Sequence, residues 1–358
     1  MLQYFFRRLL MLFPVVIGIV VVVFVIVRLI PGDPCSVMLG EKATVDQCEA
    51  FKARFGLTDS VPVQLGRYIF NVIQGDFGMS IRDKIPITTI IAERLPMTIE
   101  LTILAVCFAS FFGIILGVIS ALNRNSIVDV LTMLGANIGV SMPVFWLGLL
   151  LAYFFALVMQ DTIFYIPPSG RLSAGTTLTP LAEFWGLGEV SGLLGFILTF
   201  LTNSAIFNGI ATGNLELLKD ALWHLLLPAM AVGTISLAVI ARMTRSSLLD
   251  VLGQDYIRTA RAKGLIERLV ISRHALRNSL VPIVTVIGLQ TGGLLSGAVL
   301  TETIFSLPGV GSRMIEAILI RDYPVVQGFT IIIAAIFVLT NLLVDISYAY
   351  LDPRIRME

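Results

Sequence analysis

The chain has 358 residues, of which 56% are hydrophobic and 14% are charged, with a net formal charge of +1 and a mean hydropathy of +0.91. Soluble domains carry about a quarter charged residues, so this composition excludes an ordinary soluble protein. The apolar residues fall in blocks of about twenty, the length that crosses a hydrocarbon core, without the alternation typical of barrel strands. The sequence therefore predicts an all-α integral membrane protein. A charge of +1 gives no sign of a nucleic-acid partner, and none is expected.

The first apolar block, Leu9–Ile30, follows Arg7 and Arg8. It is longer than the apolar region of a signal peptide, and no small-residue cleavage pattern precedes Cys35, so we interpret it as a retained span. The mixed polar stretch that follows predicts a small folded region outside the membrane. Five further spans complete a set of six: Met97–Leu122, Val128–Val158, Leu222–Ala241, Leu280–Leu300 and Gly328–Leu351.

A seventh apolar stretch, Gly192–Leu201, is too short to cross a bilayer. Six spans also place both termini and the loop between the fourth and fifth spans on one side. That loop has an excess of Lys and Arg, so the positive-inside rule predicts that this side is the cytoplasm. The chain is then divided into 1–30 (tail and first span), 31–96 (outer region), 97–160 (spans two and three), 161–221 (long outer loop) and 222–358 (spans four to six, with a cytoplasmic loop at 242–278).

The cytoplasmic loop holds a short predicted helix, because Asp255 is suited to cap its start and Gly264 to end it. Small residues near this helix would let a partner surface approach closely. The alternative is a solvated basic loop that obeys the positive-inside rule and contacts anionic lipid.

Several stretches of the sequence form recognisable motifs. The cytoplasmic loop reads DYIRTARAKGL at residues 255–265, followed by HALRNSLVP at 274–282. Other such stretches are IPGDP (30–34), FGLTDSVPVQLGRY (55–68), GDFGMSI (75–81), RLPMTIEL (94–101), SMPVFWLG (141–148), TETIFSLPGVG (301–311), RDYPVVQG (321–328) and LVDISYAYLDPRIR (343–356). Together these stretches resemble the permease subunits of dipeptide and oligopeptide ABC importers, most closely the first of the two permeases.

This resemblance implies a type I ABC importer permease fold that works by alternating access. It also implies a homologous second permease subunit, two ATPase subunits that bind ATP and Mg, and a substrate-binding protein, all at the bacterial inner membrane. The coupling helix of the family would place the ATPase contact at Tyr256, Arg258, Thr259, Ala260, Arg261, Lys263 and Gly264. Importers of nickel, glutathione and haem resemble the same family, so the cargo stays open among these and peptides.

Neutral polar residues inside the spans are candidates to line a pathway, because polar groups in lipid are costly and usually face protein or water. The candidates are Asn137, Ser141, Gln290 and Thr291, with hydrogen bonding between helices as the alternative. Glycine pairs with GxxxG spacing predict close helix contacts; they are Gly113 with Gly117, Gly135 with Gly139, Gly288 with Gly292, and Gly293 with Gly297. Glu100 and Asp345 are expected near span ends, in contact with solvent.

Cys35 and Cys48 both fall in the outer region, where a disulfide is permitted; two free thiols are the alternative. Cys107 is expected to pack inside the second span. With two histidines and no cysteine pair at ligand spacing, a metal site is not expected. No phosphate-binding loop or hydrolase motif is present, so we expect no cofactor in this chain and no hydrolysis by it. The remaining hypothesis is an ion-driven carrier or a membrane enzyme. A carrier would need acidic residues inside the spans and an enzyme would need a catalytic set, and the sequence shows neither.

Overall fold

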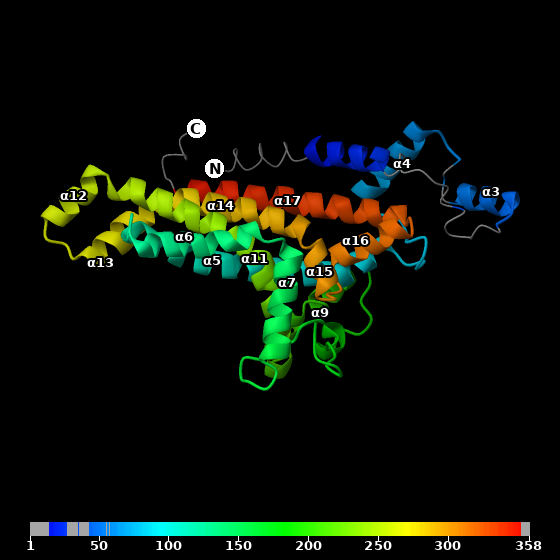
Figure 1. Cartoon of the computed structure of the whole chain (residues 1–358). Coiled ribbons are helices and arrows are strands. Elements are labelled where there is room, and N and C mark those ends of the chain that lie inside the picture. The colour runs from blue at the N-terminus through cyan, green and yellow to red at the C-terminus, as the bar shows by residue number, and fades with distance from the viewer. Residues whose placement is uncertain (1–13, 27–34, 36–42, 55, 57, 352–358) are drawn as a thin grey trace.

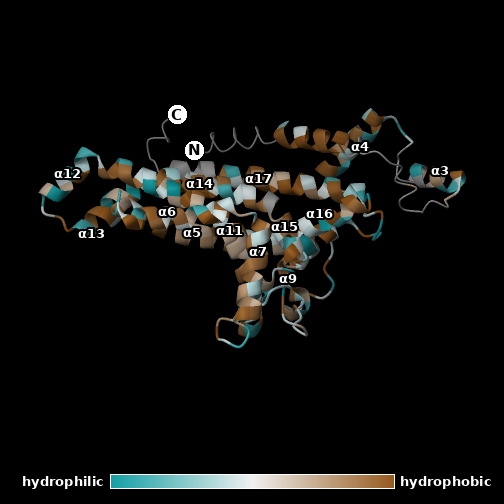
Figure 2. Ribbon diagram, in the orientation of Figure 1, coloured by the Kyte–Doolittle hydropathy of each residue, from teal (hydrophilic) through white to brown (hydrophobic). Residues whose placement is uncertain are grey.

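The fold is an elongated bundle of helices in a computed structural model that describes residues 14–26, 35, 43–54, 56 and 58–351. Within these residues no β-strand forms, apart from a single bridge between Met79 and Pro86. Helices α12 and α13 lie at one end of the bundle and α3 and α4 at the other (Figure 1). Figure 2 shows apolar residues along the bundle and hydrophilic ones gathered at the α12 end.

The long helices are α5 (Ile87–Leu122), α11 (Leu215–Leu252), α14 (Leu276–Gly297) and α17 (Tyr323–Leu351). The shorter ones are α3 (Val45–Arg54), α4 (Val61–Ile73), α6 (Ile127–Ser141), α7 (Val144–Ala152), α8 (Leu181–Phe184), α9 (Gly192–Thr202), α10 (Ala205–Ala211), α12 (Asp255–Ala262), α13 (Glu267–Leu269), α15 (Val299–Ile304) and α16 (Val310–Leu319). Two π-helical turns, η1 (Tyr153–Val158) and η2 (Val270–Ala275), extend α7 and precede α14.

Four helices are long and apolar enough to cross a membrane: Ile87–Leu122, Leu215–Leu252, Glu267–Leu295 and Tyr323–Leu343. Two bent pairs, α6 with α7–η1 and α9 with α10, raise the number to six by length and composition. The predicted first span is represented by an apolar helix at Pro14–Ile26, and the rest of that prediction lies outside the described residues.

The predicted third span, Val128–Val158, is not one straight helix. It bends by 105° between α6 and α7, and α7 leaves the side of the bundle (Figure 1). The cause is Pro143, which has no amide hydrogen to donate and disfavours a helical conformation for the residue before it. Met142 accordingly has the extended angles φ −96° and ψ 137°.

Two helices extend beyond the predicted spans. Helix α5 begins at Ile87, ten residues before the predicted start at Met97, and α11 continues to Leu252, into the predicted loop at 242–278. Hydropathy marks only the part of a helix that lies in lipid, whereas these helices continue beyond it. At the other end of α11, the Asn214 side chain accepts a hydrogen bond from the Leu217 amide at 3.0 Å and caps the start.

Helix α11 forms the centre of the bundle, with buried residues along most of its length. Helix α5 packs closely along it because glycines remove the side chains between them. A Cβ on Gly113 would lie 2.9 Å from the Leu237 carbonyl oxygen, and one on Gly117 would lie 2.6 Å from that of Ala241. This predicted GxxxG pair is confirmed as a contact between helices.

The opposite face of α5 carries large apolar side chains that are exposed in the isolated chain, namely Ile103, Phe111, Phe112, Ile115 and Ile119. Exposed apolar area of this extent suits lipid or another membrane subunit.

Candidate functional site

Helix α12 forms the hydrophilic tip of the bundle and coincides with the predicted coupling segment (Figure 2). Two of its apolar residues, Ile257 and Ala260, are buried, while the charged residues of the same helix are exposed. The spacing of three places both apolar residues on one face of a helix. One face is therefore fixed to the protein, and the other is available to a partner.

The buried face packs into a small core made from the ends of three other elements. Its buried members are Ala121 of α5, Leu248 of α11, Ile257 and Ala260 of α12, and Val270 and Ala275 of η2. Ala260 therefore gives a close approach to the chain's own helices. Ala260 is only 7% exposed, so most of its surface already contacts this chain. The contact between Ala260 and an ATPase stays a prediction.

Both ends of α12 are sharply defined. Gln254 occupies the N-cap position and makes no side-chain cap bond, so Asp255 is the first helical residue and not the predicted cap. At the other end Gly264 has φ +77°, a conformation that favours glycine. Its amide donates to the Arg261 carbonyl at 2.9 Å, and that of Leu265 donates to the Ala260 carbonyl at 3.4 Å.

The exposed face of α12, which we define as Tyr256, Arg258, Thr259, Arg261 and Lys263, carries three positive charges. Arg261 binds both carboxylate oxygens of Glu267, at 3.1 and 2.6 Å. The Tyr256 hydroxyl accepts a hydrogen bond from the Asn278 side chain at 2.8 Å. These contacts tie the helix to the start of the following span. Arg258 pairs with Asp255 of the same helix at 3.4 Å, with both side chains exposed, and Lys263 is also exposed.

The predicted pathway residues lie on two helices that both pack against α11. Asn137 and Ser141 are exposed on the last turn of α6, just before the bend at Pro143, while Gln290 and Thr291 are half-buried in α14. The Ser141 hydroxyl donates to the Asn137 carbonyl at 3.1 Å, and that of Thr291 donates to the Ile287 carbonyl at 2.8 Å. Both hydroxyls are thus bonded within their own helices.

Glu100 is buried, so the expected contact with solvent is wrong. Its carboxylate accepts hydrogen bonds from the Ser204 hydroxyl at 2.6 Å and the Ile206 amide at 2.7 Å, and it forms an ion pair with Arg171 at 3.4 Å. Arg171 also donates to the Asn203 carbonyl. These bonds join α5 to the long loop. Sequence analysis could not identify the partners of Glu100, because they lie 71 to 106 residues further along the chain.

Two more buried carboxylates organise the end of the bundle away from α12. Glu302 accepts from the Thr98 hydroxyl at 2.6 Å and from the Ser312 amide at 3.0 Å, at the start of α16. Burial raises the pKa of the Glu302 carboxyl above its usual range, and these hydrogen bonds offset part of that rise. Asp322 accepts from the Ser80 hydroxyl at 2.5 Å and from the Ile81 amide at 3.1 Å.

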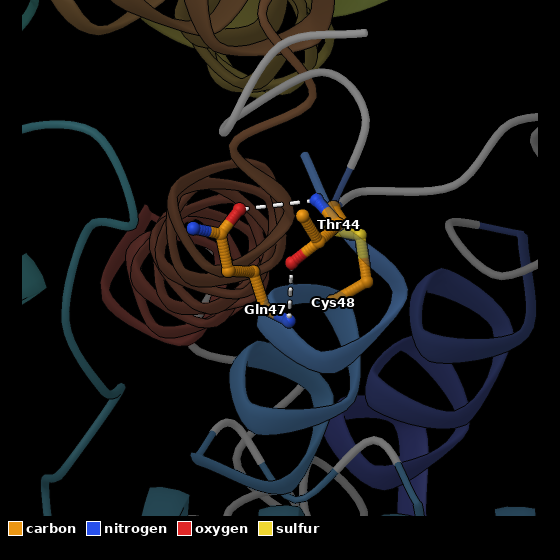
Figure 3. The surroundings of a disulfide bond; sticks show 4 residues. Thr44, Gln47 and Cys48 are labelled. Carbon is orange, nitrogen blue, oxygen red and sulfur yellow. Dashed lines mark hydrogen bonds between the residues drawn. A yellow bond between two sulfur atoms is a disulfide. The ribbon is translucent and has the colours of Figure 1, made fainter. Parts of the chain in front are cut away.

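Cys35 and Cys48 form a disulfide with a Cα–Cα distance of 5.4 Å (Figure 3). Cys48 belongs to α3, whose start is a capping box. The Thr44 amide donates to the Gln47 side chain at 3.0 Å, and the Gln47 amide donates to the Thr44 hydroxyl at 3.4 Å. Cys107, which was expected to pack internally, is exposed on α5.

Among the described residues, no group of three or more His, Cys, Asp or Glu side chains is placed to hold a metal ion. Several helices long and apolar enough to cross a membrane, and an exposed polar helix at one end, define a class: a helical membrane protein with a polar surface at one end of its bundle.

Comparison with known proteins identifies the family. Residues 113–357 match the family described as "Binding-protein-dependent transport system inner membrane component", and residues 1–102 match the N-terminal region of such membrane components. The chain belongs to this family. It is a multi-pass permease subunit of an ABC importer in the bacterial inner membrane, and the family description implies a binding protein and an ATPase as partners.

The chain is similar over its full length to several permeases. The dipeptide transport system permease protein DppB of Alkalihalophilus pseudofirmus is 45% identical over 356 residues, covering 99% of this chain and 100% of the relative. DppB of Escherichia coli K12 is 45% identical over 357 residues, covering 99% of each. The glutathione transport system permease protein GsiC of Pectobacterium atrosepticum is 36% identical over 358 residues, covering 100% of each. This membership excludes the ion-driven carrier considered from the sequence.

Proposed function

We propose that this chain carries dipeptides or short oligopeptides through the inner membrane as one of two homologous permease subunits. The support is the 45% identity to dipeptide permeases along the whole chain. Glutathione, itself a short peptide, is the second candidate because of the 36% identity to a glutathione permease. The neutral side chains of Asn137, Ser141, Gln290 and Thr291 would line a pathway that tolerates varied cargo side chains.

The energy would come from two partner ATPase subunits that bind ATP and Mg, since this chain has no phosphate-binding loop. ATP binding would draw the coupling helices together and open the permease pair outward, and hydrolysis would return it inward. Both termini and α12 would lie in the cytoplasm. The disulfide supports this orientation, because α3, which contains Cys48, lies at the end of the bundle opposite α12 and would face an oxidising compartment.

The observation that supports coupling to the ATPase subunits is that α12 has one buried face and one exposed face. Ile257 and Ala260 fix the helix to the bundle core, while Arg258, Thr259 and Lys263 face outward at its tip. A helix anchored in this way transmits a force applied to its outer face into the spans.

Substrate-stimulated ATPase activity of the complete transporter in proteoliposomes tests this role. Arg258→Glu reverses a charge on the exposed face of α12 without entering the core, so we expect normal assembly and a loss of stimulation by about tenfold. Arg67→Glu on α4 is the matched control, because Arg67 is also exposed and also pairs with an aspartate, Asp59. Full stimulation of Arg258→Glu would contradict the coupling role.

Uptake of radiolabelled dipeptide and of radiolabelled glutathione, each with its binding protein, tests the cargo. We expect ATP-dependent uptake of the dipeptide. Uptake of glutathione alone would replace the peptide assignment with the second candidate.

A further inference from the structure

An ion pair between Asp129 of α6 and Arg245 of α11 joins two helices near the α12 end. Arg245 Nε lies 2.8 Å from one carboxylate oxygen of Asp129, and Arg245 Nη2 lies 2.7 Å from the other. This two-point geometry fixes orientation as well as distance. Asp129 is 5% exposed, so the pair is shielded from water on the carboxylate side.

The remaining lone pairs of Asp129 are also used. The Ser120 hydroxyl at the end of α5 donates to the carboxylate, as does the Asn125 amide at 3.0 Å. Asp129 therefore connects α5, the turn that follows it, α6 and α11. A carboxylate with this many partners holds one position and not a range of positions.

Helix α6 is held to α11 at a second place. Gly139 packs so closely on Thr234 that a Cβ at position 139 would lie 1.8 Å from the threonine methyl group. The two attachments are ten residues apart on α6 (139 − 129) and eleven apart on α11 (245 − 234). Nearly equal spacing along two antiparallel helices means that neither attachment can slide without breaking the other.

Helix α11 leads directly to α12. It ends at Leu252, three residues before Asp255, and Leu248 lies in the core that holds Ile257 and Ala260. At the far end of α6, Asn137 and Ser141 precede the bend at Pro143. Displacement of α12 would thus move α11, and α6 with it.

We infer that Asp129 and Arg245 are positioning residues that transmit displacement of α12 to the bend of α6 at residues 137–143. The inference rests on the proposed coupling function, and it adds the route by which that coupling reaches the membrane interior. An α-helix rises 1.5 Å per residue, so the twelve residues from Asp129 to Ser141 carry the motion roughly 18 Å.

The first test compares ATPase activity of the reconstituted transporter with Asp129→Asn, Arg245→Lys and the charge exchange Asp129→Arg with Arg245→Asp. We expect the single variants to keep basal hydrolysis and lose about fivefold in stimulation by the loaded binding protein, with partial recovery in the exchange. Asp59→Asn, which removes an exposed carboxylate that also pairs with an arginine, is the matched control.

The second test reports motion at the bend, which a merely structural role would leave unchanged. Ser141→Cys is introduced with Cys107→Ser, and labelling by a soluble maleimide is compared without nucleotide and after trapping with ATP and vanadate. We expect labelling to change on trapping when Asp129 is present, and to stay constant in Asp129→Asn. Arg245→Lys provides the same comparison if Asp129→Asn does not assemble.

The inference is overturned if Asp129→Asn keeps both the stimulation and the labelling change. The proposed function fails separately, if Arg258→Glu on α12 is stimulated normally. Loss in Arg258→Glu with full activity in Asp129→Asn would leave coupling through α12 intact and show that it reaches the spans by another route.

Discussion

Glu302 is fully buried, yet it satisfies the start of α16 in the way a capping side chain does. Two glycines make this possible, because a Cβ at Gly309 would lie 2.3 Å from the carboxyl group and one at Gly311 would lie 3.0 Å from it. The position near a helix N-terminus favours negative charge, whereas burial favours the protonated form. Burial has the larger effect, so the pKa of Glu302 is raised.

This rise predicts a pH dependence of stability. A carboxyl group with a higher pKa in the folded than in the unfolded chain takes up a proton on folding, so its contribution is greatest in acid and is lost as pH rises. We expect the Tm of the wild type minus that of Glu302→Gln to fall as the pH rises above about 4.5, the ordinary pKa of a glutamate. Thermal unfolding of the detergent-purified chain measures this, and a difference that increases with pH would contradict it.

The disulfide gives a second prediction for single residues. Cys35 and Cys48 are 13 residues apart, and closing a loop of this size stabilises by about 3 kcal/mol in the chain-entropy model. Cys35→Ser should therefore speed proteolysis of the segment around α3 and leave the rest of the bundle unchanged. Cys107→Ser is the control and should have no effect. Equal proteolysis of the reduced and oxidised wild type would contradict the prediction.

Among the helices, the close packing of α5 on α11 is the contact most sensitive to side-chain size. Gly117→Leu would place a side chain where Thr244 and the Ala241 carbonyl already lie, so we expect a loss of about 1–3 kcal/mol in stability. Gly135 has the same GxxxG spacing with Gly139, but a Cβ there meets nothing within 4 Å. Gly135→Leu should be neutral in thermal unfolding, and an equal loss in both variants would refute the packing argument.

Sequence reasoning located the helices better than their ends. Hydropathy found the centres of α5, α11, α14 and α17 because lipid selects for apolar residues. It did not find their extensions, such as the last turns of α11 up to Leu252, which lie outside the apolar blocks. The bend at Met142-Pro143 was visible as a proline, but an apolar average across the block concealed it.

The sequence predicted where α12 lies along the chain, but not which of its faces packs against the bundle. The resemblance identified the segment around α12, and Gly264 ends the helix as expected. Which side of α12 meets its own core depends on Leu248 and Val270, which come from other elements. The partners of Glu100 and Asp129 were equally invisible, because Arg171 and Arg245 lie 71 and 116 residues further along the chain.

For the molecule as a whole, the two ends have different chemistry. The α12 end is hydrophilic and is joined to the centre by α11, whereas α3 and α4 lie at the opposite end (Figure 1, Figure 2). A permease that couples ATP hydrolysis on one side to substrate delivery on the other needs this polarity. Under the proposed function, helix α11, which runs through the core, would provide the mechanical connection between the two ends.

Site-specific photocrosslinking in the assembled transporter tests the central claim most directly. A photoreactive amino acid is placed at Arg258 on the exposed face of α12 and, as control, at Ile73, which is 64% exposed on α4 near the opposite end. The account predicts a crosslink from position 258 to an ATPase subunit, and none from position 73. A crosslink to the ATPase from position 73, or its absence at position 258 in a complex that hydrolyses ATP, would contradict the assignment of α12 as the coupling helix.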